Sequence, residues 1–568
     1  MAKPPAADPG DGRDAGGLTR RRALGVGLGA GAGAWALGSG TAAAEAASST
    51  TFDPTGLQVV TAGTVQDALE QVDERLEGTI GGPGIINVRD YGAVGDGVTN
   101  DMAAVIDALI VDKSSSNPFD WVPRFDPAVG GILYFPPGVY YFTGIIIVWF
   151  SGLRIMGAGA GRTTLLFKQT GYSGPIDYAP KIWFADPRGD RRVRDQSISD
   201  LTVTTDLLLD TAPSRDAGES PLQFWQADRI EIARVEVVDS PAFGISITDA
   251  TDCVVKDCHV HDIHIDGIHL KGVTRGLVHG CLVDHTGDDA IAVSGGSQAD
   301  HESLLSSQVV VSSNVVSRSG SRGICVFGAD GVVVSDNTVK DTHQAGIGIL
   351  PDRNNGNTRH VVIRGNHIDG VGLYGEDTDV LWGAGIPAAI SVGSPFDSDT
   401  PDQTVDDVLV EGNLVNDCRN GFVLIERASD VKVAGNQFYG PITVAQPAPG
   451  SHQQAGTGSG QILVPSPPYS GGGTPVYPAV RVRRAKRVRI DNNLVRPASN
   501  ERAFLVEGPT AAEVVRARVS DNSIDRGTSP PLGTGGVDEI AIGPAGVVAY
   551  QGGNDVNGLA IAPASTPA

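Results

Sequence analysis

The chain has 568 residues, of which 40% are hydrophobic, and this is enough apolar material for a substantial core. Its net charge of −23 argues against nucleic acid or an anionic membrane as the main partner. The 75 glycines indicate many turns, and five cysteines in so long a chain are too few for a disulfide framework.

The N-terminus has the pattern of an export signal. Arg20, Arg21 and Arg22 precede an apolar run rich in glycine and alanine at 25–40, and the alanine-rich segment 42–46 offers a cleavage site of the A-x-A type. The pattern resembles a twin-arginine signal, so we expect residues 1–47 to be removed and the mature protein to be secreted. A membrane anchor is the alternative, but the run is only weakly hydrophobic, and no later segment is long and apolar enough to span a bilayer.

The segment after the signal predicts a short helical cap followed by strands. Residues 48–84 form an N-terminal arm in which Val65–Leu76 has the period of a helix. Residues 86–101 then predict a strand, a turn rich in Gly and Asp, and a helix start, so we expect a helix at Met102–Leu109. Residues 130–140 predict a strand that enters the first coil of a repeat.

A repeat of 23 residues governs the rest of the chain. It relates Val235, Cys258 and Cys281, and longer spacings equal this unit plus a loop. Each unit contains two β-rich runs and cannot bury its faces alone, so the units must stack. We expect an all-β fold, a single-stranded right-handed parallel β-helix (a solenoid) over 85–524, with 525–568 as a C-terminal cap or tail.

One position of the repeat predicts a ladder of buried side-chain amides. An asparagine occupies this position in most units: Asn314, Asn337, Asn366, Asn413, Asn436, Asn493 and Asn522. Cys258 and Cys281 fall at the equivalent position upstream. They should lie one above the other as reduced thiols, although the stacking would also allow a disulfide bond.

The same register brings three carboxylates together. Asp266 precedes Gly267-Ile268, and the pair Asp288 and Asp289 precedes Ala290-Ile291, with 23 residues between Asp266 and Asp289. Equivalent residues of a repeat stack, so Asp266 and Asp289 should be neighbours with Asp288 beside them. Acids held this close repel one another, and folds keep them mainly for proton chemistry or for holding a cation.

The strands that follow these acids predict the surroundings of the site. The column through the acids should contain Phe243, Asp266, Asp289, Arg322 and Ala345. By alternation, we expect the following residues to point outward: His269, Lys271, Ala290, Ala292, Ser294, Cys325 and Gly348. A floor of small residues, made of Ala290, Ala292, Gly346 and Gly348, would leave room for a ligand. The loops at 294–308 and 370–404 would wall it, and Tyr374 and Trp382 of the second loop suit stacking on a sugar.

The strand, turn and helix start at 86–101 resemble the opening of the pectate-lyase-like β-helix superfamily, and the resemblance covers roughly Ile85 to Ile524. The acids resemble those of the polygalacturonase family. The resemblance implies inverting hydrolysis, in which Asp288 is the general acid and Asp266 and Asp289 hold and deprotonate the attacking water. Arg322 stands where that family has a histidine, and Gly348 and Leu350 stand where it has a basic pair that grips the uronate. The missing grip argues against galacturonan as the substrate.

The sequence therefore predicts an exported glycoside hydrolase that acts on a polysaccharide or oligosaccharide. We expect catalysis by Asp266, Asp288 and Asp289, substrate binding by His269, Lys271, Arg322, His343 and Trp382, and no cofactor or metal. The alternatives are a lyase or C5-epimerase in which the acids bind Ca²⁺, an intramolecular fructotransferase, and a non-catalytic carbohydrate-binding β-helix. A structural Asp ladder would also account for the acids, and a homo-oligomer such as a trimer stays open.

Overall fold

The computed structural model describes a part of the chain that lies within residues 80–568. The described residues are 84–170, 179–189, 191–206, 220–295, 305–351, 357–371, 388–393, 404–418, 421–439, 479–496, 503–507, 515–526, 540–542, 547–552, 554–556 and 559–560. The predicted signal at 1–47, the helix expected at Val65–Leu76, Tyr374 and Trp382 lie outside these residues.

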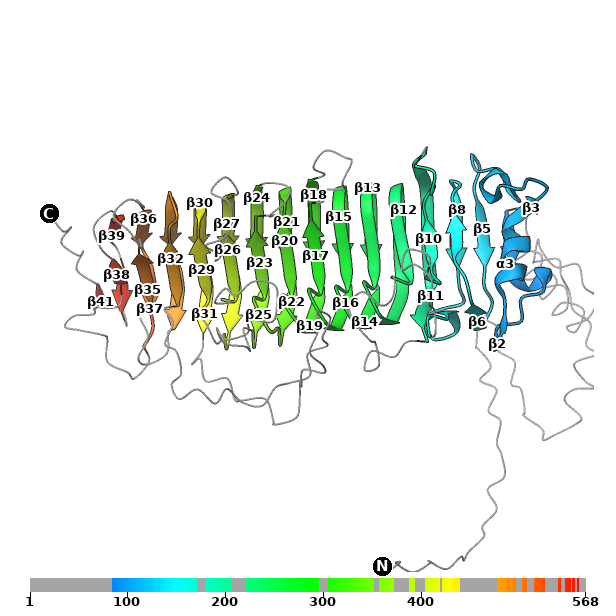
Figure 1. Cartoon of the computed structure of the whole chain (residues 1–568). Coiled ribbons are helices and arrows are strands. Elements are labelled where there is room, and N and C mark those ends of the chain that lie inside the picture. The colour runs from blue at the N-terminus through cyan, green and yellow to red at the C-terminus, as the bar shows by residue number, and fades with distance from the viewer. Residues whose placement is uncertain are drawn as a thin grey trace, which may run out of the picture. The chain divides into compact units, whose positions relative to one another are not determined.

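The described part begins with strands and a short helix, shown in blue in Figure 1. The predicted helix is confirmed as α3 (Met102–Leu109), with η2 (Val88–Tyr91) and η3 (Pro118–Asp120) as short 3-10 turns and β3 (Ile110–Asp112) and β4 (Val122–Pro123) as an antiparallel pair. Asp101 precedes α3, and its buried carboxylate accepts hydrogen bonds from the amides of Val94 and Gly95. Within the described residues, no helix is long and apolar enough to cross a membrane.

The remaining strands stack as parallel rungs, coil upon coil, and this confirms the predicted β-helix. Each full coil has three strands rather than the two predicted runs. One β-rich run of the repeat, Val309–Val316, is broken between β18 (Ser306–Ser312) and β19 (Val315–Ser319) at Ser313, which has a positive φ of 57°. The coil therefore has three faces. We call the face that follows the acids the first face, and the next two along the chain the second and third faces.

The strands of the first face are β7 (Ile146–Val148), β10 (Ile182–Phe184), the first part of β12 (Leu222–Ser240), the first parts of β13 (Ile245–Lys256) and β15 (Ile268–His279), β17 (Ile291–Ser294), β20 (Ile324–Phe327), β23 (Ile347–Leu350), β26 (Ile390–Gly393), β29 (Val423–Glu426), β32 (Val480–Arg483), β35 (Phe504–Glu507) and β38 (Ile540–Ile542).

The second face contains β1 (Ile85–Asn87), β5 (Gly131–Tyr134), β8 (Leu153–Met156), part of β11 (Val193–Thr205), the later parts of β12, β13 and β15, β18 (Ser306–Ser312), β21 (Ala329–Ser335), β24 (Thr358–Arg364), β27 (Val405–Glu411), β30 (Ala428–Ala434), β33 (Val488–Asp491), β36 (Val515–Ser520) and β39 (Val547–Gly552).

The third face contains β2 (Asp96–Asn100), β6 (Gly138–Phe142), β9 (Thr163–Phe167), the ends of β11 and β12, β14 (His259–Ile263), β16 (Leu282–Thr286), β19 (Val315–Ser319), β22 (Thr338–Lys340), β25 (His367–Asp369), β28 (Leu414–Asn416), β31 (Gln437–Tyr439), β34 (Leu494–Arg496), β37 (Ser523–Ile524) and β40 (Asp555–Val556), with β41 (Leu559–Ala560) antiparallel to β40. The rungs β38, β39 and β40 lie beyond residue 524, in the segment expected to be a cap or tail.

The interior is filled by alternate residues of every strand, mostly Val, Ile and Leu. The residues that alternate with those predicted to point outward beside the acids are all fully buried in this core: Ile268, Leu270, Ile291 and Val293. Burial of this apolar column contributes roughly 25 cal/mol per Å² of surface removed from water, and it fixes which side chains of each strand face outward.

The predicted asparagine ladder is confirmed and reaches one coil further, to Asn554. Asn337 shows the pattern: its main-chain N–H and its Nδ2 both donate to Oδ1 of Asn366, and Nδ2 also donates to the carbonyl of Val311. From Asn314 to Asn522, the residue before each ladder position has a positive φ, and it is Gly, Asp, Asn or Ser, the kinds of residue that tolerate that region best. Cys258 and Cys281 continue the column as free, buried thiols.

Candidate functional site

The acids lie on the corner between the third and first faces. Asp266 lies between β14 and β15, and Asp288 and Asp289 lie between β16 and β17. The main-chain amide of Gly267 donates to the carbonyl of Asp289, and the amide of Ala290 donates to the carbonyl of Arg322. The predicted column of Asp266, Asp289 and Arg322 is therefore confirmed.

The three carboxylates are close together. One oxygen of each of Asp266, Asp288 and Asp289 lies within 4.8 Å of the others. Their exposure differs: the side chain of Asp288 is 13% exposed, that of Asp266 8% and that of Asp289 3%. Asp288 is therefore the acid that an incoming ligand reaches most easily.

Asp289 is held by Arg322. The main-chain N–H and Nε of Arg322 donate to Oδ1 of Asp289 at 3.0 and 2.7 Å, and Nη2 donates to Oδ2 at 3.0 Å. Burial raises the pKa of Asp289, while the charge of Arg322 opposes that rise and the charge of Asp266 adds to it. Burial lowers the pKa of Arg322, but the neighbouring groups, Asp289 first and Asp288 among them, together raise it above its usual value.

Asp266 is held by His269 and by the next coil. Its Oδ1 accepts the amide N–H of Asp289 at 3.0 Å, and its Oδ2 lies 2.9 Å from Nδ1 of His269. The other ring nitrogen of His269 lies 2.8 Å from Oγ of Ser294. The ring of Phe243 packs edge-on against that of His269, with centroids 4.9 Å apart.

The hydrogen bonds therefore link Ser294 to His269 and His269 to Asp266, in the same order as in the triad of a serine hydrolase. However, Ser294 is only 1% exposed, and the neighbouring amide of Gly295 donates to the carbonyl of Phe327. Among the described residues around this serine, which end at Gly295, there is neither an accessible nucleophile nor a free main-chain donor for an oxyanion. The relay is thus better suited to fixing the orientation of His269 and Asp266.

The predicted floor of small residues is wrong in part. Ala290 is buried in the interior core, and a Cβ on Gly346 would meet Ile368 there, because the chain is still turning at these positions. Gly348 does point outward, but a Cβ there would lie 3.1 Å from Cδ of Arg322. Arg322 therefore occupies room that the sequence had assigned to a ligand.

The other predicted binding residues are spread along the first and third faces. Lys271 is half-buried on β15, two residues after His269 on the same side of the strand. His343 is 2% exposed and lies just after β22, on the coil of Ala345, two coils beyond Asp289. Burial limits its contact with a substrate. Trp382 and most of the two predicted wall loops lie outside the described residues.

Two aromatic residues on the first face were missed by the sequence reasoning. Trp183 on β10 and Trp225 on β12 flank core residues, so they point outward, and their rings stack 5.8 Å apart at 7°. Trp225 is in register with Thr248, and Thr248 with Lys271, so Trp225 lies two rungs (roughly 10 Å) before the coil of Asp266 and three rungs before the coil of Asp288 and Asp289. Trp183 lies one rung further from the acids. Their positions next to the core phenylalanines Phe184 and Phe224 on first-face strands could have identified them.

A separate groove of about 360 Å³ lies on the second face, lined by β8, β11 and β12. Its charged side chains include Arg229 and Asp195, which pair with each other through two hydrogen bonds of 2.6 Å. It contains none of the predicted site residues. The chemistry of the acid cluster makes that corner the stronger candidate site.

Comparison with known proteins supports the fold. A family model described as "Right handed beta helix region" matches residues 243–445. Solved structures of similar fold include the A-module of mannuronan C-5 epimerase AlgE6 from Azotobacter vinelandii, with 15% identity, a TM-score of 0.44, and 83% of this chain and 99% of that chain covered. A search of the curated proteins found no match.

Two further solved structures are similar. An exopolygalacturonase from Thermotoga maritima has 14% identity and a TM-score of 0.43, with 83% of this chain and 91% of that chain covered. Bacteriophage phi29 gene product 12 has 13% identity and a TM-score of 0.52, with 86% and 57% covered. Of these three structures, gene product 12 alone has a TM-score above 0.5, and at 13% identity that likeness is evidence for the fold alone. The chain is a right-handed parallel β-helix protein.

Proposed function

We propose that this protein is a polysaccharide-active enzyme, and specifically a glycoside hydrolase that uses Asp266, Asp288 and Asp289. The observation that carries the proposal is the set of three carboxylates whose oxygens lie within 4.8 Å of one another, with Asp288 the most exposed. Hydrolysis of a glycosidic bond needs one carboxyl group to protonate the leaving oxygen and a second to assist attack at the sugar carbon. Solenoid folds bind such extended substrates along their faces.

Asp288 is the proposed general acid, and Asp266 and Asp289 are proposed to position the water. Asp288 is the most exposed of the three acids, so its carboxyl group is the one best placed to reach a leaving oxygen. Inverting enzymes separate the two carboxyl groups by about 6.5–9.5 Å, and retaining enzymes by about 5–5.5 Å. The spacing here is shorter than the inverting range, so the anomer that is released first has to be measured.

The proposed substrate is neutral or weakly charged. The guanidinium of Arg322 is committed to Asp289, so it is not offered to a substrate carboxylate. Gly348 and Leu350 carry no charge at the positions of the uronate grip. Trp183 and Trp225 provide apolar rings on the same face, which suits stacking against a sugar.

A Ca²⁺-dependent lyase or epimerase is the second candidate. Three carboxylate oxygens this close are also the kind of ligands that Ca²⁺ takes. In that reaction a base would remove the proton α to a uronate carboxyl group, and a lyase would leave an unsaturated product. The two candidates therefore differ in their dependence on Ca²⁺ and in ultraviolet absorbance.

The test is a panel of neutral and acidic polysaccharides incubated with the parent, Asp288→Asn and Asp336→Asn. Asp336 is an exposed corner residue with φ 58°, which asparagine also tolerates, so it controls for the substitution itself. Reducing ends, absorbance and Ca²⁺ dependence are measured together, and proton NMR identifies the first anomer. We expect the parent and Asp336→Asn to release reducing ends at equal rates, and Asp288→Asn to be slower by about 10²–10⁴-fold.

The other possible outcomes would favour a different function or refute the role assigned to Asp288. A gain in absorbance that needs Ca²⁺ favours the lyase, and a non-reducing product favours the transferase. Full activity of Asp288→Asn refutes the assigned general acid. Binding without any product on the whole panel makes the protein a carbohydrate-binding β-helix.

A further inference from the structure

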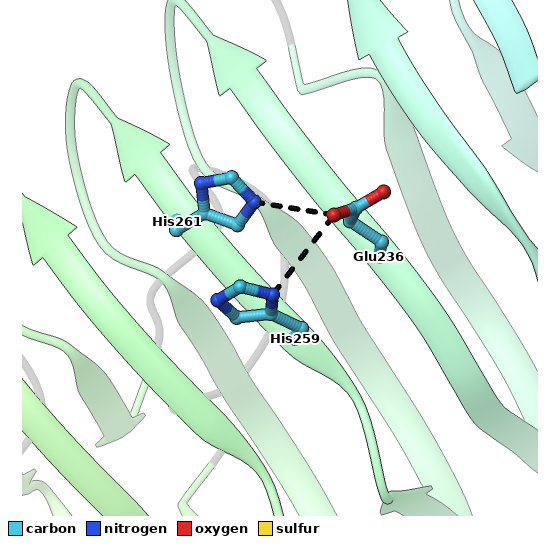
Figure 2. A group of neighbouring side chains, drawn as sticks. All are labelled: Glu236, His259 and His261. Carbon is cyan, nitrogen blue, oxygen red and sulfur yellow. Dashed lines mark hydrogen bonds and ion pairs between the residues drawn. The ribbon is translucent and has the colours of Figure 1, made fainter. Parts of the chain in front are cut away.

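A second cluster of chemically active side chains lies on the third face. Glu236 on β12 is in register with His259 on β14, and His261 lies two residues further along β14 (Figure 2). Val260 between the two histidines is fully buried in the core, so both imidazoles point outward. The side chains of Glu236, His259 and His261 are 28%, 42% and 21% exposed, so solvent reaches the cluster.

The spacing of the three side chains suits one metal ion. Oε1 of Glu236 lies 3.5 Å from Nε2 of His261 and 3.9 Å from Nδ1 of His259, and all three atoms lie within 4.8 Å of one another. Zinc binds nitrogen and oxygen at about 2.0–2.2 Å, so two ligands of one tetrahedral ion are about 3.4 Å apart. Only small movements would bring the three atoms to that spacing.

The hydrogen bonds around His261 leave a lone pair facing the carboxylate. Nδ1 of His261 lies 2.7 Å from Oδ2 of Asp262, and a carboxylate only accepts, so Nδ1 carries the proton. In the neutral ring, Nε2 is then an acceptor, and it faces the acceptor oxygen of Glu236. A divalent cation satisfies Glu236, His259 and His261 at once, whereas a single proton satisfies one pair.

Neighbouring residues fix the ligands from behind. Oγ1 of Thr202 donates to Oε2 of Glu236 at 2.6 Å, which leaves Oε1 directed at the rings. Asp262 also lies 2.6 Å from Nδ1 of His285, so its carboxylate is held on both sides. A carboxylate that binds the far nitrogen of a histidine is the usual support of a metal ligand, because it sets the tautomer and the ring orientation.

We propose that Glu236, His259 and His261 bind a divalent transition-metal ion, with Zn²⁺ as the representative ion. Three protein ligands leave a coordination position for water or a ligand oxygen, as in zinc sites that exchange ligands. The ion would also link two adjacent coils, since Glu236 and the histidines come from successive rungs. The site is independent of the proposed hydrolase: imidazoles favour transition metals, while a set of carboxylates alone favours Ca²⁺.

The test is Zn²⁺ binding by the full chain without a polyhistidine tag, after chelator treatment. A chromophoric chelator that competes for Zn²⁺ reports stoichiometry and affinity, and Co²⁺ absorption reports the ligand geometry. We expect one Zn²⁺ per chain. We expect at least tenfold weaker binding in His259→Ala and Glu236→Gln, and about 10–100-fold weaker binding in Asp262→Asn. Asp288→Asn and His279→Ala, an exposed histidine on β15, should bind as the parent does.

A thermal scan separates loss of a ligand from loss of the fold. Zn²⁺ should raise the Tm of the parent and not that of His259→Ala, while the Tm values without metal stay close. The proposal is overturned if the parent forms no one-to-one complex, or if His259→Ala keeps the parent's affinity. Weaker binding in Asp288→Asn alone would assign the ion to the acid cluster and would also overturn it.

Discussion

Removing the Arg322 guanidinium leaves the Asp289 carboxylate buried without its charge partner. Arg322→Met keeps most of the side-chain length and removes the Nε and Nη2 donors, while the main-chain N–H of residue 322 remains. Breaking a buried ion pair from one side costs about 3–5 kcal/mol of unfolding free energy. Because Asp289 is 3% exposed and both its oxygens are bonded to Arg322, we expect a loss in that range at pH 8.

The loss should depend on pH. Burial already raises the pKa of Asp289, and Arg322 is the main cause that opposes the rise, so the pKa increases further in Arg322→Met. A carboxyl group with a raised pKa in the folded state holds its proton there more tightly, so its contribution to stability is present at low pH. That contribution is lost as pH rises from the unfolded value, about 3.9, through the folded value. We therefore expect a smaller loss at pH 5 than at pH 8.

The assay is urea denaturation followed by tryptophan fluorescence at both pH values. Arg322→Met combined with Asp289→Asn should recover much of the lost stability and lose the pH dependence that Arg322→Met introduces, because no buried carboxylate remains at position 289. Arg496→Met is the control, since Arg496 pairs with Asp525 on the surface with 52% of its side chain exposed, and it should cost at most about 1 kcal/mol. Equal losses in Arg322→Met and Arg496→Met at pH 8, or a loss that ignores pH, would refute the reasoning.

Asn413→Ala should lower the free energy of unfolding by about 2–4 kcal/mol in the urea assay. The substitution removes two donated hydrogen bonds and leaves buried partners in both neighbouring coils unsatisfied. A loss no larger than that caused by Asn416→Ala, at a partly exposed asparagine, would argue against the ladder's role. Thiol titration at pH 8 should find the cysteines unreactive until denaturant is added, since burial raises the pKa of Cys253 to about 12; rapid reaction of the native protein would contradict this. Replacing Arg20 and Arg21 with lysine should keep the protein in the cytoplasm, as fractionation would reveal; unchanged secretion would count against the twin-arginine signal.

The repeat made much of the architecture predictable. The register of 23 residues and the recurring asparagines were sufficient to predict parallel stacking, the inward side chains beside the acids, and the column of Asp266, Asp289 and Arg322. These features follow from stacking alone, since equivalent residues of a repeat must lie one above the other. The third strand of each coil was missed because a single residue with positive φ, such as Ser313, turns the chain without interrupting the apolar pattern.

The details of the site were less predictable. Period-two alternation fails at corners, so Ala290 and Gly346 were assigned to the wrong side of the chain. The direction of a long side chain is not encoded in its position, and Arg322 turned out to fill space above Gly348. The proposed metal site could have been predicted from the repeat in the same way as the acids, because Glu236 and His259 are also 23 residues apart.

The asparagine ladder has a direction. In every rung from Asn314 to Asn522, the amide of one coil donates to the side-chain oxygen of the next coil toward the C-terminus, and never the reverse. Each coil thus has a donor side and an acceptor side, so the ladder is polar along the axis of the β-helix. An inserted or duplicated coil can continue the ladder only in the same orientation as its neighbours. Growth of such a protein by coil duplication is therefore built into its hydrogen bonding, whereas two chains meeting by like ends could not share the ladder.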